Sequence, residues 1–407
     1  MRHSQFFGVL FGSGTPEKEG RSTKRIVLSG LVGLVLALGL FAIATTPPAL
    51  AFDWWGDRDP IREVVIKGAD LHLSRQGTYT NACGSGYGPP DVPEINSTWE
   101  WLIGSGQTCW NVGGISALGL LAAYQRTHNQ HYLRGAIAQG NTLVAKYNMI
   151  VTNDPNGAGW EDRPFSQDIE FLVLLSQTSH KSSYARVARD WYRIITDNKT
   201  AEENANRYID ARLSLAGWDL ASHIRAAVAV GEWHYAQGMA RRLVERRSDW
   251  EGKPLGGYDY TMSSYASLLW AFEELWFAGH DIVAAERDFL EMVLQAQAQD
   301  GPQKGSWEDG DYQTTAYAIL GLDAVKVRGR DLRHDVATAL GKAFSYLRDT
   351  QTEEGGWRYP PPDDVEYGEV NSEVLLALGG LQEREIAGRL VDPAPGGTQK
   401  PAATPAK

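Results

Sequence analysis

The feature that most constrains this chain is a structural unit that recurs with a period of roughly 50 residues. Each unit consists of an aromatic and acidic loop, an almost wholly apolar helix and an amphipathic helix. A helix that is apolar on all sides is buried, whereas an amphipathic helix covers a core with one face. Strand-like alternation does not rise above background between residues 52 and 388. The pattern therefore predicts an array of helical hairpins with an inner and an outer layer.

The two ends of this array are complementary. An open solenoid needs polar capping repeats at both ends, but here the first outer helix lacks an inner partner and the last inner helix lacks an outer one. Pairing these two helices closes the array into a ring. We therefore predict an all-α (α/α)6 toroid, a single domain spanning residues 52–388. The predicted inner helices cover 115–124, 165–176, 223–231, 264–276, 314–325 and 369–381, and the outer helices cover 60–76, 132–147, 184–195, 235–246, 282–297 and 332–350.

One stretch, residues 342–357, has the sequence KAFSYLRDTQTEEGGW. Its order of basic, small, aromatic, aliphatic, Gln, Gly and Trp residues resembles the QW motif of the terpenoid cyclase and protein prenyltransferase toroid superfamily, which includes squalene cyclase-like proteins. A weaker copy lies upstream, with a longer gap before the glycine. The resemblance implies that each copy ends an outer helix of a toroid. The copies contain Gln351, Gly355 and Trp357, and Gln297, Gly305 and Trp307.

The catalytic motifs of that superfamily are missing from the chain. Class II terpene cyclases carry an Asp-x-Asp-Asp-Thr-Ala run, whereas the aligned run here is Asp311-Tyr-Gln-Thr-Thr-Ala. Gln313 occupies the proton-donating position, and an amide cannot donate that proton. The zinc ligands of protein prenyltransferases are missing, and Cys83 is not followed by the Gly-Glu-Gln of thioester domains. The resemblance thus implies the architecture without these reactions, and we expect no metal site and no cofactor.

The N-terminus predicts export. Basic residues between positions 18 and 25 precede the uncharged apolar run 26–44, and residues 49–51 have the small-x-small form that signal peptidase accepts. We predict a periplasmic or secreted protein with a signal peptide over 1–51. Since the apolar run is nearly long enough to span a bilayer, an uncleaved signal anchor is the alternative and would be the only membrane contact. Residues 389–407 are rich in Pro and Ala and predict a disordered tail.

Charge and cysteine content limit the partners and the redox setting. The net charge is -11, and residues 52–388 contain no basic cluster. Binding to nucleic acid needs Lys and Arg to neutralise phosphates, so a nucleic-acid partner is not expected. The two cysteines, Cys83 and Cys109, predict a disulfide in an oxidising compartment. The sequence leaves the oligomeric state open.

The loops that precede the inner helices meet at one mouth of the ring, because the inner helices all run in the same direction. These loops are rich in acidic and aromatic residues. One interpretation is structural, with carboxylates capping helices and aromatic residues holding the hairpins together. The other is functional, with carboxylates doing acid-base work while aromatic faces stack on sugar rings or on a small apolar ligand. The predicted substrate-binding residues are Trp160, Asp168, Glu170, Trp218, Asp219, Tyr258, Asp259, Trp307, Trp357, Asp363 and Asp364.

Four residues are candidates for catalysis. Asp309 and Asp311 flank a glycine, and like charges that close raise one pKa and so provide an acid and a base. His223 titrates near neutral pH, although a lone histidine on a buried helix is more often part of the core. Tyr260 is a candidate base for a lyase.

The leading functional hypothesis is an exported protein that acts on or binds a carbohydrate polymer at the acidic, aromatic mouth. If it is an enzyme, we expect a glycoside hydrolase or a polysaccharide lyase. The first alternative is a non-catalytic ligand-binding or assembly module. The second is a divergent enzyme of isoprenoid lipids, which would require an apolar cavity with acids confined to its rim.

Overall fold

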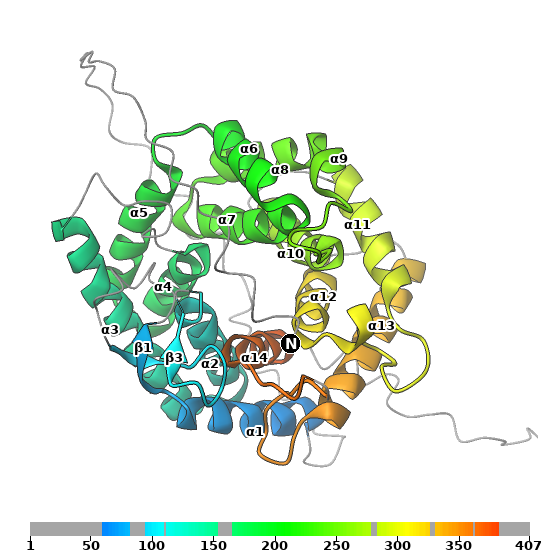
Figure 1. Ribbon diagram of the computed structural model, residues 1–407, viewed down its shortest axis with the longest axis horizontal. Coiled ribbons are helices and arrows are strands. Elements are labelled where there is room, and N and C mark those ends of the chain that lie inside the picture. The colour runs from blue at the N-terminus through cyan, green and yellow to red at the C-terminus, as the bar shows by residue number, and fades with distance from the viewer. Residues whose placement is uncertain are drawn as a thin grey trace, which may run out of the picture.

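The computed structural model confirms the predicted toroid. It describes residues 59–81, 94–109, 111–153, 165–277, 283–325, 330–360 and 363–381. Six inner helices stand side by side in a closed ring, and each contacts its neighbours (Figure 1). The inner helices are α2 (Gly113–Thr127), α4 (Ser166–Ser179), α7 (Ala216–Val230), α10 (Thr261–Phe277), α12 (Tyr312–Ala324) and α14 (Gly368–Gly380).

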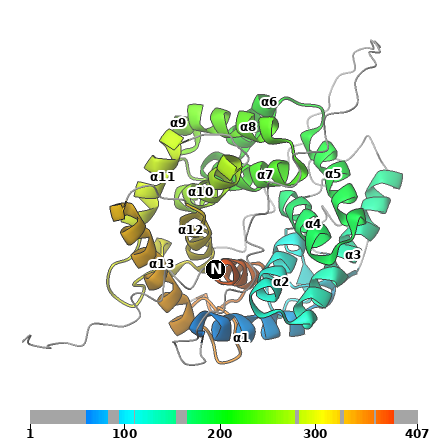
Figure 2. The same ribbon diagram turned by 180° about the vertical axis from the view of Figure 1, so that it is seen from behind.

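Six further helices cover this ring from outside, and the view from behind shows the same two layers (Figure 2). Their amphipathic character explains their position, because α5 buries one stripe of residues and exposes the opposite face. The inner helices are apolar nearly all round, as expected for helices packed on several sides. The outer helices are α1 (Pro60–Ser74), α3 (Gln130–Asn153), α5 (Ser182–Thr196), α8 (Trp233–Glu245), α11 (Val283–Ala296) and α13 (Arg330–Thr350).

The ring closes where the sequence predicted, between its first and last helices. The outer helix α1 packs on α14 and on α2, and α14 packs on α2. Arg75, just after α1, forms a bidentate ion pair with Glu366, just before α14. Contacts between residues nearly 300 positions apart therefore join the two ends of the described chain.

Some elements were not predicted. A small sheet of β1 (Gly77–Asn81), β2 (Ile95–Thr98) and β3 (Gln107–Thr108) has the order β2-β1-β3 and accompanies the predicted helices. These strands are too short for alternation to stand out. Helix α6 (Ala201–Arg212) starts with a capping box and adds to the outer layer, and α7 begins at Ala216 rather than at residue 223. Short helical segments lie at α9 (Arg247–Trp250), η2 (Leu213–Leu215) and η3 (Glu308–Gly310).

The QW-like segments end outer helices, as the resemblance implied. The Gln351 amide donates to the carbonyls of Val64 and Gly355, and the Trp357 indole N–H donates to the Leu347 carbonyl. Gly355 has a φ of +113°, which an L side chain rarely adopts. The segment therefore closes the C-terminal turn of α13 and ties it to α1.

The upstream copy repeats this geometry between α11 and α13. The Gln297 amide donates to the carbonyls of Gly305 and Ala339, and the Trp307 indole N–H donates to the Val293 carbonyl. Each copy thus links one outer helix to the next around the ring.

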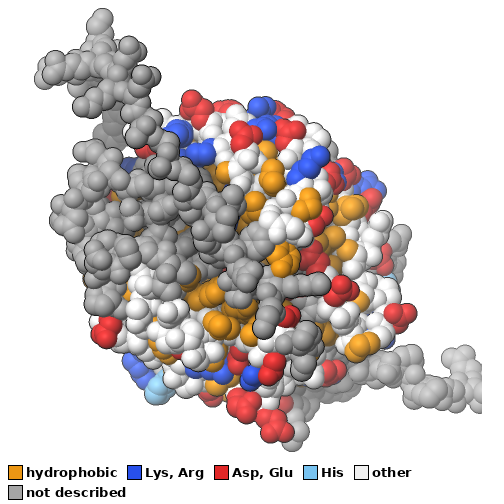
Figure 3. Space-filling view, viewed as in Figure 1, with side chains coloured by type: hydrophobic (Ala, Val, Ile, Leu, Met, Phe, Trp, Pro, Cys, Tyr) orange, Lys and Arg blue, Asp and Glu red, His pale blue; other side chains and the backbone are white. Residues whose placement is uncertain are grey.

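The surface of the face seen in Figure 3 carries hydrophobic side chains towards its middle and charged side chains mainly along its edge. No helix within the described ranges is both long and apolar enough to cross a membrane. The predicted export segment 1–51 and the predicted tail 389–407 lie outside the described residues.

Candidate functional site

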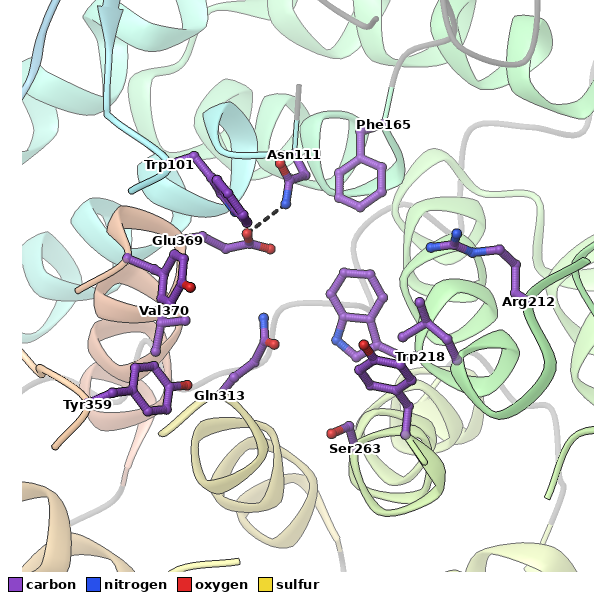
Figure 4. Close-up of a pocket in the computed structure, with 13 residues that line it drawn as sticks. Trp101, Asn111, Phe165, Arg212, Trp218, Ser263, Gln313, Tyr359, Glu369 and Val370 are labelled. Carbon is purple, nitrogen blue, oxygen red and sulfur yellow. Dashed lines mark hydrogen bonds between the residues drawn. The ribbon is translucent and has the colours of Figure 1, made fainter. Parts of the chain in front are cut away.

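A pocket opens at the mouth of the ring, where the inner helices begin (Figure 4). Leu215, Val370 and two aromatic groups contribute apolar surface to its wall. One aromatic group comes from the segments around β3 and α14, and the other from the starts of α4, α7 and α10. Flat aromatic faces on two sides suit a ring-shaped ligand. The aromatic residues are Trp101, Tyr359 and Tyr367 in the first group and Phe165, Trp218 and Tyr260 in the second.

Glu369 is the carboxyl group among the described residues that line this pocket. It lies in the first turn of α14 and is only 5% exposed. The Asn111 amide donates to Glu369 Oε2 at 2.6 Å, and the Trp101 indole N–H also donates to this carboxyl group. Burial raises the pKa of Glu369, and these two donors oppose the rise only in part.

Glu373 lies one helical turn below Glu369 and is fully buried. Its carboxyl group accepts hydrogen bonds from the Tyr317 hydroxyl and from the Gln313 amide, each at 2.9 Å. Burial raises the pKa of Glu373, and the neighbouring Glu369 raises it further. Because two adjacent buried carboxyl groups cannot both ionise easily, the pair retains a proton near neutral pH.

Arg212 projects towards the pocket from the side opposite Glu369 (Figure 4). Its Nε donates to Asp219 Oδ2 at 2.6 Å, and the Asp219 side chain is only 7% exposed. Burial raises the pKa of Asp219, and the positive charge of Arg212 opposes this rise. The guanidinium is therefore paired within the protein.

The predicted pair Asp309 and Asp311 does not act as a pair. Asp311 is the N-cap of α12, where Oδ1 accepts from the Thr314 amide and Oδ2 accepts from the Tyr359 hydroxyl. Asp309 is exposed and has a φ of +57°. The bond to Tyr359 brings Asp311 to the pocket wall, whereas nothing brings Asp309 there.

Other predicted residues do reach the pocket. Trp218 and Tyr260 line it, and Asp219 holds Arg212 at its edge. Both aromatic residues are half-buried, so part of each ring faces the opening. Their position agrees with the predicted binding role, but the role itself stays a prediction.

The prediction that Trp307 and Trp357 stack on a ligand was wrong. Both side chains are 0% exposed, because each folds back over the preceding helix turn and donates its indole N–H to a backbone carbonyl. These tryptophans stabilise the hairpins and cannot contact a ligand.

The prediction of a catalytic His223 was also wrong. The ring is fully buried on the outward side of α7, against Tyr192, Tyr208 and Tyr235 of the outer layer. Burial, with a smaller contribution from the charge of Arg207, lowers its pKa to about 3. A neutral histidine that faces away from the pocket cannot exchange protons with a ligand there.

Two predicted acids are buried between helices. Asp168 accepts from the Gly114 amide, and burial raises its pKa to about 7. Glu170 pairs with Arg225, whose guanidinium lies 3.7 Å from the centroid of the Trp270 ring. Neither acid lines the mouth pocket, and buried acids inside the ring also disagree with the lipid alternative, which confined acids to the rim.

The remaining predicted residues lie at the surface or outside the described part of the chain. Asp259 caps the start of α10 through Thr261, Tyr258 packs near Tyr260, and Asp364 pairs with Arg358. Asp363 is half-buried, and none of these four predicted residues lines the pocket. Trp160 and Cys83 lie outside the described residues. Cys109 is buried after β3, and its pairing with Cys83 stays a prediction.

Several pocket residues were missed as site residues. Gln313 was noted only as a departure from the cyclase motif, and Asn111 carried no signal at all. Glu369 could have been identified from its position at the start of an apolar helix. A carboxylate at that position is normally interpreted as a partner of the helix dipole. Within the described ranges, no cluster of three or more His, Cys, Asp or Glu side chains is arranged to hold a metal ion.

Comparisons with known proteins show the fold of this chain but do not assign it to a family. No family model and no curated protein matches the sequence. Among solved structures, the GH76A alpha-1,6-mannanase from Salegentibacter sp. HEL1_6 has a TM-score of 0.50 and 11% identity, covering 79% of this chain and 98% of that chain. A polysaccharide lyase has a TM-score of 0.50 and 11% identity, covering 82% and 98%. At such identities the likeness shows a shared α/α toroid fold. It does not show the terpenoid cyclase superfamily.

Proposed function

We propose that the protein hydrolyses a glycosidic bond of a carbohydrate polymer in the mouth pocket, with Glu369 as the proton donor. The observation that carries this proposal is the position of Glu369, which lines the pocket together with two groups of aromatic side chains and whose pKa is raised to about 8 by burial. Two proteins of similar fold, a mannanase and a polysaccharide lyase, act on carbohydrate polymers and support the substrate class.

In this mechanism Glu369 protonates the oxygen of the scissile glycosidic bond, and the bond to the anomeric carbon breaks. A water molecule adds to that carbon, and a carboxylate takes up its proton. We assign this base to Asp311, because the Tyr359 hydroxyl holds it beside the pocket wall. Asn111 and Trp101 fix the orientation of the Glu369 carboxyl group at the pocket wall.

We also propose that the protein is exported, either as a secreted or periplasmic protein or retained by its N-terminal apolar segment. The support is the sequence pattern of residues 18–51 alone. Fractionation of the producing cells and N-terminal sequencing test it, and a cytoplasmic protein with an intact N-terminus would contradict it.

The test of the catalytic assignment is turnover by the purified protein on a panel of neutral and uronic polysaccharides, followed through new reducing ends. We expect Glu369→Gln to reduce kcat by about 10²- to 10⁴-fold, the usual contribution of a general acid. Glu353→Gln is the matched control, since Glu353 is exposed in the turn after α13. Equal activity of the two variants would refute the role of Glu369.

The second carboxylate is tested by comparing Asp311→Asn with Asp309→Asn. The two residues lie two positions apart, but only Asp311 contacts the pocket wall. Asparagine tolerates the left-handed backbone at position 309, so the control should fold normally. We expect a large loss of turnover for Asp311→Asn alone, and equal effects would remove Asp311 from the mechanism.

The same assay separates the alternatives. Products that absorb in the ultraviolet would indicate elimination by a lyase and contradict hydrolysis. Saturable binding of an oligosaccharide without any product would support the non-catalytic binding module instead.

A further inference from the structure

Several donor side chains of the mouth pocket point at carboxyl groups of the protein itself. The Asn111 amide and the Trp101 indole N–H both donate to Glu369. The Gln313 amide donates to Glu373 below the pocket floor. These three side chains therefore each have a donor in use before any ligand arrives.

Donor side chains on the other sides of the pocket are also directed at carboxyl groups of the protein. The Tyr359 hydroxyl donates to Asp311 at 2.9 Å. Arg212 is the only cationic side chain among the described residues of the lining, and its Nε donates to Asp219 at 2.6 Å. The pocket thus offers no unpaired positive charge within the described part of the chain.

Acceptor groups remain available to a ligand. The carbonyl oxygens of the Asn111 and Gln313 amides have no role in the bonds above, and the carboxyl oxygens of Glu369 can also accept. The hydroxyl of Tyr260 is uncharged and can act either way. A ligand rich in O–H or N–H donors finds partners in such a wall.

A carboxylate or sulfate group on the ligand would not find suitable partners in this wall. It needs donors or a free cation, and it would lie near Asp311 and Asp219 in a partly water-excluded site, where like charges repel more strongly than in bulk water. Leaving a charged group unpaired in such a site is costly.

We infer that the mouth pocket selects sugars without negative charge, either neutral or amino-substituted, and discriminates against uronic and sulfated sugars. This inference rests on the proposed function only in taking the ligand to be a carbohydrate. Arg212 and Asp219 set the discrimination, because the Asp219 carboxylate offsets the charge of the only cation among the described lining residues.

The test is calorimetric titration of the whole protein with matched oligosaccharides. The probes are neutral manno- and gluco-oligosaccharides, the same oligomers oxidised at C6 to uronic acids, and glucosamine oligomers. We expect the neutral or the glucosamine oligomers to bind at least about tenfold more tightly than the uronic ones. The difference should shrink as salt is added, since salt screens charge repulsion. Tighter binding of the uronic oligomers, or binding of none of the probes, would overturn the inference.

A charge variant tests the cause. Asp219→Asn leaves Arg212 without its carboxylate, so we expect the preference for neutral over uronic oligomers to shrink about tenfold. Asp190→Asn is the control, since it breaks a similar Asp-Arg pair with Arg193 on the outer surface. Equal effects of the two variants would contradict the assigned role of Arg212.

These experiments separate the inference from the proposed function. Selective binding of neutral oligomers without any turnover would support the inference and refute hydrolysis. Turnover of uronic polymers through new reducing ends would support hydrolysis and refute the inference.

Discussion

Tryptophans near the starts of the inner helices fall into two groups with different roles. Trp307 and Trp357 are fully buried and donate their indole N–H groups to backbone carbonyls of the preceding outer helix. Trp101 and Trp218 are half-buried and line the pocket. The first group follows a QW-like glycine by two positions, and the second group does not. In the two QW-like copies, this spacing marks the tryptophans that hold a hairpin together.

The buried His223 makes stability depend on pH. Its pKa in the folded protein is lowered to about 3 by burial among Tyr192, Tyr208 and Tyr235, with the charge of Arg207 adding to the shift. The unfolded chain binds a proton below about pH 6.5, while the folded protein does not. Folding stability therefore falls as the pH drops from about 6.5 towards 3, by roughly 2 kcal/mol between pH 6.5 and pH 5 from this residue alone.

Replacement of His223 by leucine tests this dependence. We expect His223→Leu to change stability little at pH 7.5, since neither ring nitrogen has a hydrogen-bond partner among the described residues, and to lose less stability on acidification. The measurement is urea unfolding at a series of pH values. His131→Leu is the control, because His131 is exposed on α3. A variant that follows the acid dependence of the original protein would contradict the argument.

At the scale of the element, the QW-like segments work because a glycine allows close backbone contact. A Cβ atom added to Gly355 would lie 2.4 Å from the Lys67 carbonyl oxygen of α1, and one added to Gly305 would lie 2.3 Å from the Lys342 carbonyl oxygen of α13. Both glycines also have a positive φ. Each glycine therefore lets one hairpin end touch the next outer helix.

Substitution of Gly355 by alanine should destabilise the protein by more than about 2 kcal/mol, because the new methyl group clashes with backbone and the φ of +113° is strained for an L residue. Gly341→Ala is the matched control within α13, where an added Cβ meets no atom within 4 Å. It should stabilise the helix by up to about 1 kcal/mol. Thermal unfolding of both variants measures the contrast, and similar shifts in both would show that the contact does not matter.

The helical elements could be predicted from the sequence because their periodicity is local. Six inner and six outer helices follow from alternating apolar and amphipathic segments, and the ring follows from the unpaired ends. The small sheet escaped prediction because β3 is only two residues long. The site was predicted only in part, since Trp218 and Tyr260 lie in the expected loops while Asn111, Gln313 and Glu369 gain their roles from contacts between separate helices. Such contacts leave no pattern in one sequence.

At the scale of the whole molecule, closure depends on a seam between the first and last helices. Gln351 donates to the Val64 carbonyl, Lys67 donates to the Thr352 carbonyl, and Arg126 donates to the Leu381 carbonyl. The last two bonds satisfy carbonyl groups just after α13 and α14, where a helix end leaves carbonyls without partners within the helix. The mouth pocket depends on the seam as well, because Glu369 lies on α14.

Removal of α1 should therefore unfold the ring and not merely shorten it. The helix buries Ile61, Val64 and Val65 against the ring, and each such side chain contributes about 1.5–3 kcal/mol. Their combined loss, roughly 5 kcal/mol or more, is comparable with the whole stability of many domains. We expect a variant that begins at Gly77 to lose cooperative thermal unfolding by circular dichroism, whereas a variant that ends at residue 388 should keep the original Tm. Cooperative unfolding of the variant without α1 at an unchanged Tm would contradict this prediction. It would show that the inner helices are stable without the contacts of α1, so that ring closure is not required for folding.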